Sequence, residues 1–297
     1  MTSVINVYKE RGYTSHDVVA IMRRIAGTKK VGHTGTLDPD ATGVLPICIG
    51  RATKLAEYLA SEDKTYIAEV ILGIETNTGD ISGEVIATKA VAFDENAIEQ
   101  AVQSFHFNVR GEYMQVPPMY SAIKIGGKKL YELARKGETI DRPARPVVIR
   151  DIKVLGFEPE NNAFTIEVKC SKGTYIRSLA TDIGQALGCG ATMGKLVRTQ
   201  SGVFSIDNAV KLEELKQAAE NDRLMEFIMP VDKLLPYPKV YISGDELRRA
   251  LNGNPLPLSV VGEMDSGEGQ KFWVYGEDRI IGLYVSDSKK LRVEVMM

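Results

Sequence analysis

The spacing of apolar and polar residues along the chain predicts a mixture of helices and strands. Residues 15–26 repeat apolar side chains at helical intervals, with Thr14 or Ser15 as the N-cap and Gly27 where a left-handed C-cap would lie. The same periodicity predicts further helices at about 52–60, 94–104, 129–136, 174–187 and 211–220. Runs of β-branched residues with partial alternation predict strands over 64–73, 146–157 and 163–170. Gly126 and Gly127 lie between apolar flanks, which is typical of a turn.

These elements do not alternate as strict strand–helix–strand units, so we expect an α+β fold. Its core would be a mixed, largely antiparallel sheet flanked by helices, and a doubly wound nucleotide-binding fold is disfavoured. After the proline cluster at 230–238 the pattern changes to a short mostly β segment. There we predict a helix at 243–251, a turn at 252–255 and strands at 271–275, 279–285 and 290–296. We therefore divide the chain into domains 1–238 and 239–297.

Composition and charge narrow the class of protein. With 297 residues, 44% apolar and 26% charged, the chain fits an ordinary globular protein of two domains. Its net charge of −2 gives no overall attraction to nucleic acid or membrane, so an anionic partner would need a local patch. No window is long and apolar enough to span a bilayer, and the N-terminus lacks a signal-peptide pattern, so we expect a cytoplasmic protein.

Metal and disulfide chemistry are not expected either. The three cysteines, Cys48, Cys170 and Cys189, lack Cys-x-x-Cys spacing and indicate a reducing compartment. The three histidines are widely separated, which leaves too few ligands for a His-rich site. Glycine-rich phosphate loops and the common hydrolase motifs are absent from the sequence, so no cofactor is expected.

A polar loop at 31–43 carries the richest chemistry in the sequence. It combines glycines and hydroxyl side chains with His33, Asp38 and Asp40. Asp38 before Pro39 is typical of a turn in which the carboxylate binds backbone N–H groups. The same carboxylate in a cleft would serve as a nucleophile or a base, and the local residues leave both alternatives open.

The run 32–54, which begins Gly-His-Thr-Gly-Thr-Leu-Asp-Pro, resembles the signature of the tRNA pseudouridine-55 synthases, the TruB family. Further segments resemble the same family in the same order: Asp-Lys-Thr-Tyr at 63–66, Pro-Pro-Met-Tyr-Ser-Ala-Ile-Lys at 117–124, Gly-Lys-Lys-Leu-Tyr-Glu at 127–132, Cys-Ser-Lys-Gly-Thr-Tyr-Ile-Arg at 170–177, and the blocks at 188–191 and 196–199. The ordered blocks extend over most of residues 9–205. One position departs from the pattern, because Glu10 stands where the family usually has proline, and this change is expected to loosen the loop before the first helix.

The resemblance implies an isomerase that needs no cofactor. It would convert uridine to pseudouridine at position 55 in the T-loop of tRNA after flipping the base out of the RNA. Asp38 would be the essential carboxylate, through covalent addition to the sugar or base or through removal of the 2′ proton. Arg177 would pair with Asp38 and lower its pKa, whereas without the family match it reads as a surface arginine. Tyr66 would stack on the uracil and relay a proton, whereas a lone tyrosine on such a strand is more often core.

The resemblance also implies substrate-binding residues, and for several of them a structural alternative remains. His33 would lie beside the flipped nucleotide or bond a turn, and Leu196 would line the pocket or the core. Tyr175 and Lys64 lie in matched segments. Residues 121–150 hold eight basic and three acidic residues, and with Lys124, Lys128 and Lys129 they would grip phosphates or form a solvated surface.

The C-terminal segment resembles, more weakly, the small β-barrel RNA-binding module (PUA) of this family. Residues 241–297 hold seven basic and nine acidic residues, which argues against a strong nonspecific grip on RNA and leaves a structural cap as the alternative. We expect a monomer whose partner is the T-arm of tRNA. Two other functions stay open: an RNA-binding protein that engages the same loop without turnover, and a synthase that works on ribosomal RNA within a guide-RNA particle.

Overall fold

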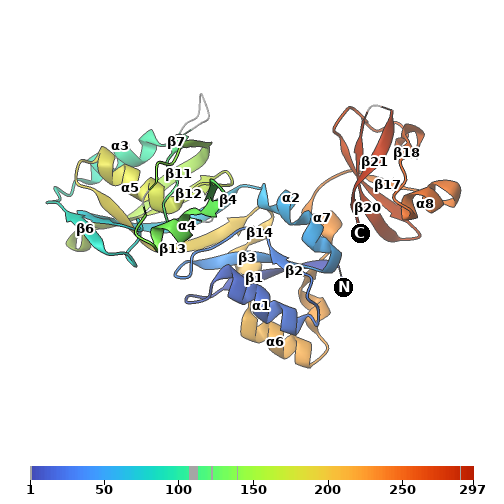
Figure 1. Cartoon of the computed structure of the whole chain (residues 1–297), viewed down its shortest axis with the longest axis horizontal. Helices are drawn as coiled ribbons and strands as arrows, with labels where there is room; N and C mark the ends of the chain where they lie inside the picture. Colours follow the sequence, from blue (N-terminus) through green and yellow to red (C-terminus); the bar gives the residue numbers. More distant parts are fainter. Residues whose placement is uncertain (1, 107–112, 122, 139, 288) are drawn as a thin grey trace.

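A ten-stranded mixed sheet forms the main body of the molecule, and the expected α+β fold is confirmed (Figure 1). The computed structural model describes residues 2–106, 113–121, 123–138, 140–287 and 289–297. The path of the sheet is β11 (Ile149–Glu158), β12 (Ala163–Cys170), β4 (Lys64–Leu72), β13 (Ala191–Ser201), β3 (Thr42–Ile49), β1 (Ser3–Lys9) and β15 (Val210–Lys211). Off this path, β14 (Phe204–Ser205), β16 (Ile228–Met229) and β2 (Val31–His33) pair with β13, β1 and β3. Most neighbours are antiparallel, whereas β3 runs parallel to β13 and β15 runs parallel to β1.

Helices cover the sheet in two groups (Figure 1). Below β1 and β3 lie α1 (Ser15–Ile25) and α6 (Leu212–Glu220), whose apolar faces share one core with these strands. On the other half, α3 (Glu95–Ser104) and α5 (Ile176–Ala186) pack on β11, β12 and β4. The predicted helix at 15–26 is confirmed. Thr14 is its N-cap in a reciprocal capping box with Asp17, and Gly27 follows it with a φ of 60°.

Shorter elements differ from the predictions in their bounds. The helix expected at 52–60 is a 3₁₀ turn, η1 (Gly50–Leu55), followed by α2 (Ala56–Ala60). The strand expected at 146–157 is divided, because Ser171 holds Val148 by two hydrogen bonds while the residues before it pair elsewhere. The remaining small elements of this part are hairpins β5–β6 (Ile74–Thr76, Val85–Thr88) and β8–β9 (Lys124–Ile125, Lys128–Lys129), the pair β7–β10 (Tyr113–Gln115, Arg145–Val147), α4 (Leu130–Ala134) and α7 (Val231–Leu234).

A five-stranded sheet follows in the C-terminal segment, so the predicted mostly β module is confirmed as a fold element. Its order is β17 (Lys239–Tyr241), β19 (Lys271–Gly276), β20 (Arg279–Ser286), β21 (Lys290–Met296) and β18 (Leu256–Pro257), with α8 (Gly244–Leu251) beside it. One face has its own core around Phe272 and Tyr284. The other face, with Trp273 and Leu283, shares a core with Val44 of the main sheet. The domain boundary between 238 and 239 stays a prediction.

Candidate active site

The loop that carries Asp38 connects β2 to β3 and is held in place by buried side chains. Ser15 Oγ accepts a hydrogen bond from the Leu37 N–H at 2.9 Å and lies 3.2 Å from the Leu37 carbonyl, to which it can donate. The Ala41 N–H donates to the Asp38 carbonyl over 3.1 Å, which closes a turn. Leu37 and Ala41 are both buried in the core that includes Tyr66. A turn is therefore present at Asp38, but backbone atoms close it, whereas the predicted bond from the carboxylate to backbone N–H groups is replaced by a pairing with Arg177.

Lys9, at the end of β1, anchors the same loop from below. Its side chain is fully buried, and Nζ lies 2.6 Å from the Ala41 carbonyl, 3.0 Å from the Pro39 carbonyl and 3.2 Å from the Glu10 carbonyl. Burial lowers the pKa of Lys9 to about 8. The sequence did not single out this lysine, because three backbone partners leave no signature in a motif. Its effect is to fix the backbone that directly follows Asp38 and to tie it to the backbone at Glu10.

Arg177 lies at the start of α5 and is the central group of the site. Its side chain is 6% exposed, and its Nε lies 3.0 Å from Asp38 Oδ2, so the expected ion pair forms. The guanidinium also donates to the Tyr120 carbonyl at 2.8 Å and to the Thr78 carbonyl at 3.1 Å. These contacts orient it rigidly toward Asp38. The alternative of a solvent-exposed surface arginine is wrong.

A second carboxylate, Asp80, belongs to the same ion network. Its Oδ2 lies 3.7 Å from Arg177 Nε, and its side chain is 16% exposed. Thr78 and Ser82 hydroxyls bind its Oδ1 at 2.9 and 2.5 Å. Asp80 was not predicted from the sequence, where it lies in a short Thr-Gly-Asp-x-Ser run after a strand. Its role depends on contact with residues that are far away along the chain.

The electrostatics of Asp38 differ from the expectation. Burial raises the pKa of Asp38, the Arg177 guanidinium lowers it, and the nearby Asp80 carboxylate raises it again, with a net increase. The expected lowering by Arg177 is present, but it is smaller than the increase that burial causes. The main cause of the net increase is burial of the carboxyl group, and the Asp80 carboxylate, which shares the Arg177 guanidinium, adds to it.

Tyr66 lies on β4 on the side of the sheet that faces this loop. The strand alternates buried and half-buried residues, and Tyr66 falls on the buried face with Ala68. Burial raises the pKa of its hydroxyl, which is also hydrogen-bonded to Arg198. Arg198 is 1% exposed, donates to the Val44 carbonyl at 2.7 Å and the Gly35 carbonyl at 3.2 Å, and lies opposite Tyr66 in the β13–β4 register. Its place in the block 196–199 was visible in the sequence, but its contact with Tyr66 was not.

The other predicted substrate-binding residues fall into two groups. Leu196 is 9% exposed in the core that contains Leu37 and Tyr66, and the backbone of Tyr175 forms two hydrogen bonds with the Gln115 side chain. His33 Nδ1 accepts from the Gly35 N–H at 3.2 Å, and burial lowers the pKa of His33 to about 4, so the ring is neutral. The turn interpretation of His33 is thus present in the structure, and a role toward nucleotide stays a prediction.

The predicted lysines occupy different environments. Lys64 is 6% exposed, and its Nζ donates to the Ala60 and Glu62 carbonyls at 2.7 and 2.6 Å, so its amino group already caps the end of α2. Lys124 and Lys128 are exposed on the β8–β9 hairpin, and Lys129 Nζ lies 5.4 Å from the Tyr131 ring centre. The hairpin follows Tyr120 in the chain by four residues, and the Tyr120 carbonyl accepts a hydrogen bond from Arg177. The structure therefore brings Asp38, Arg177 and Tyr66 to one loop-lined region and leaves the lysines around it.

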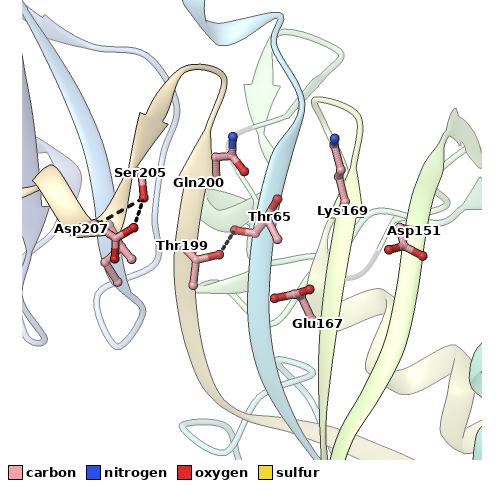
Figure 2. A pocket seen from close by; sticks show the side chains of 9 residues that line it. Thr65, Asp151, Glu167, Lys169, Thr199, Gln200, Ser205 and Asp207 are labelled. Atoms are coloured by element: carbon pink, nitrogen blue, oxygen red, sulfur yellow. Dashed lines mark hydrogen bonds between the residues drawn. The ribbon is translucent and has the colours of Figure 1, made fainter.

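An open cavity of about 350 Å³ lies on the opposite face of the same strands. Figure 2 shows its lining, which includes Thr65 of β4 and Glu167 and Lys169 of β12. Thr65 lies on the face of β4 away from Tyr66, because successive residues of a strand alternate between faces, and Lys169 pairs with Thr65 in the register. None of the predicted site residues lines it. Within the described ranges no helix has the length and apolarity required to cross a membrane.

Solved structures of other proteins share this fold. The fold matches the crystal structure of a Cbf5–Nop10–Gar1 complex with a TM-score of 0.75 and 28% identity, covering 99% of this chain and 84% of that one. It also matches a structure of an H/ACA RNP bound to a substrate RNA containing 2′-deoxyuridine, with a TM-score of 0.72, 26% identity and coverage of 99% and 84%.

Sequence relatives assign the chain more narrowly. The family model of the TruB pseudouridylate synthase N-terminal domain matches residues 23–176, and that of the tRNA pseudouridylate synthase B C-terminal domain matches 177–236. The tRNA pseudouridine synthase B of Alkaliphilus oremlandii is 47% identical, over 95% of this chain and 92% of that protein. The corresponding protein of Clostridium novyi is 43% identical over the full length of both. The chain belongs to the TruB family of pseudouridylate synthases, isomerases that convert uridine to pseudouridine in tRNA.

Proposed function

We propose that the protein isomerises a single uridine, at position 55 in the T-loop of tRNA, with Asp38 as the essential carboxylate. The observation that carries this proposal is the ion pair of the buried Arg177 with Asp38, on a loop held by Lys9 and Ser15, in a chain 47% identical to a tRNA pseudouridine synthase B. No electron or group is exchanged in the reaction. The N1–C1′ bond breaks, the base rotates, C5 bonds to C1′, and the C5 proton leaves while N1 gains one.

In this proposal the protein supplies position and charge. The target base inside a folded loop must leave its stack, at a cost of a few kcal/mol that stacking and phosphate contacts offset. Asp38 then acts in its ionised form, either by addition to the sugar or base or by taking the 2′ proton, and Arg177 keeps it aligned. In this proposal the Tyr66 ring stacks on the uracil and its hydroxyl relays the final proton.

Binding residues surround this centre. We infer that Tyr175 and Leu196 line the pocket, that His33 lies beside the flipped nucleotide and that the 121–150 segment grips phosphates through Lys124, Lys128 and Lys129. The net positive charge of that segment supports this, because it holds eight basic and three acidic residues. The C-terminal module of 239–297 would add RNA contacts, and the enzyme would work in the cytoplasm as a monomer.

Mapping of the modified position tests the proposal. Unmodified tRNA transcript is incubated with the protein and pseudouridine is located by carbodiimide treatment and primer extension. Modification of the T-loop uridine alone is the expected result, and modification of a bare T-arm hairpin would exclude dependence on a guide RNA. Binding of the transcript without modification would instead favour the RNA-binding function, and modification at a different uridine would contradict the proposed target.

A further inference from the structure

A second basic surface is formed by elements other than the 121–150 segment. We define the α1–η1 surface as six exposed residues at the end of α1, in the turn before β2 and in η1: Arg23, Arg24, Lys29, Lys30, Arg51 and Lys54. No Asp or Glu occurs at positions 18–37 or 41–56, from which all six come. Among the described residues none of the six forms an ion pair with an Asp or Glu. Arg51 and Lys54 bond the Met297 and Met296 carbonyls, so the positive charge with no such partner in the described part of the chain lies on Arg23, Arg24, Lys29 and Lys30.

Backbone contacts hold the three segments of this surface together. The Thr28 N–H donates to the Arg23 carbonyl, so the turn folds back on the last turn of α1. The Gly50 N–H donates to the Lys30 carbonyl at 2.7 Å, which places η1 beside that turn. In η1, Lys54 Nζ also lies 3.3 Å from the Met296 carbonyl at the end of β21, so the surface continues to the C-terminal module.

Ordinary structural needs explain only part of this charge. Arg23 and Arg24 lie in the last turn of α1, where cations complement the helix dipole. Lys29 and Lys30 lie beyond that helix and have no such role. The surface also lacks exposed large apolar side chains, which protein–protein interfaces use as anchors. An anionic partner without an apolar requirement fits it best.

The position of the surface indicates which part of an RNA would reach it. Lys30 and Gly50 lie at the far end of β3, whereas the Asp38 loop meets the near end at Thr42. The seven residue steps from Thr42 to Ile49 span roughly 23 Å at strand spacing. A nucleotide flipped into the Asp38 site belongs to a loop, and the RNA at such a distance from it is the helical stem.

We infer that the α1–η1 surface binds the phosphate backbone of an RNA duplex that continues the stem of the substrate. This inference rests on the proposed function, because it takes the flipped nucleotide to lie at Asp38. The surface would read no sequence. Its contribution would be to affinity, to salt dependence and to the direction in which the stem leaves the site.

Two RNA hairpins of different stem length allow this inference to be tested separately from the proposed function. One is a T-arm hairpin with its natural short stem, and the other has the same loop on a stem longer by one helical turn. Binding of both is measured over a range of salt concentrations for the wild type and for the double variant Lys29→Gln/Lys30→Gln. The matched control is Lys211→Gln/Lys216→Gln, which removes equal charge from exposed positions on and beside α6. Thermal melting checks that each variant folds.

The Lys29→Gln/Lys30→Gln variant should bind the long hairpin about tenfold more weakly, with a log K against log[salt] slope flatter by about two. Its loss on the short hairpin should be several-fold smaller, and the control should match the wild type. Unchanged affinity and slope on the long hairpin, or equal losses on both hairpins, would overturn the inference. Pseudouridine formation in the short hairpin by wild-type protein reports the proposed function separately.

Discussion

At the scale of single residues, the site is governed by competing influences on one carboxylate. Burial and Asp80 raise the pKa of Asp38, and Arg177 opposes them. Partial burial removes water from the Asp38 carboxylate, and the ion pair with the rigid Arg177 guanidinium holds it in one orientation. The ionised form of Asp38 is the form that the proposed chemistry uses, so activity should fall as pH falls through its raised pKa.

Removal of Arg177 should move that acid limit upward. Without the main group that lowers the pKa of Asp38, the midpoint of the acid limb of the single-turnover rate should rise by roughly one to three pH units in Arg177→Met. Arg177→Lys keeps a positive charge and should shift the midpoint less. A midpoint in Arg177→Met that coincides with the wild-type value would contradict the electrostatic role of this arginine.

The residues that the sequence revealed at the site are those that belong to contiguous motifs. Asp38, Tyr66 and Arg177 each lie in a recognisable block, and the structure brings all three together. Lys9, Asp80 and Arg198 were not predicted, because each acts through backbone carbonyls or a distant charge. The direction of the net Asp38 pKa shift was also beyond reach, since it depends on how far the folded chain buries the carboxyl group and on the nearby Asp80.

At the scale of elements, the parallel pairing of β3 with β13 positions the catalytic loop. Gly43 on β3 lies opposite Arg198 on β13, has a φ of 106°, and an added Cβ would lie 2.2 Å from the Arg198 carbonyl oxygen. Only glycine allows this approach. The closeness of the two strands sets both the end of the Asp38 loop and the place from which Arg198 reaches Tyr66.

Gly43→Ala should therefore destabilise the protein and disturb the site together. We expect a loss of about 2–4 kcal/mol in the free energy of unfolding, measured by urea denaturation, from the strained backbone and the clash. Gly156→Ala is the matched control, because its Cβ would meet nothing within 4 Å and it has no positive φ. Equal stability of the two variants would show that the β3–β13 contact tolerates a side chain.

Long periodic elements were predictable from the sequence, and short ones were not. The strand over 163–170 and the helix over 15–26 came out almost as expected, because each buries one face of a regular pattern. The prediction over 146–157 missed the break at Val148, where Ser171, the residue after β12, bonds both the N–H and the carbonyl. The positions of β5–β6 and α7 depend likewise on partners that local pattern does not encode.

At the scale of the whole molecule, the C-terminal module is joined to the main body by a shared core. Trp273 and Leu283 of its sheet pack in one apolar cluster with Val44, Leu55 and Phe204. The Trp273 indole N–H donates to the Leu235 carbonyl at 2.9 Å. This apolar contact favours a fixed placement of the module over a flexible tether.

The shared core predicts that both parts unfold together. Trp273 is the single tryptophan of the chain, so its fluorescence reports on the C-terminal sheet, while far-UV circular dichroism reports mostly on the larger body. The two urea transitions should coincide in midpoint. An earlier fluorescence transition would mean that the module unfolds independently and that the shared core contributes little to its stability.

The central claim is that Asp38 is required for chemistry and not for binding, and Asp38→Asn tests it most directly. The single-turnover rate of pseudouridine formation is measured with saturating enzyme. The affinity for the same tRNA is measured separately by titration. Asn keeps the shape but cannot ionise, so the rate should fall about 10⁴-fold while the affinity stays close to that of the wild type. A rate within tenfold of the wild type would contradict the assignment of Asp38 as the essential carboxylate.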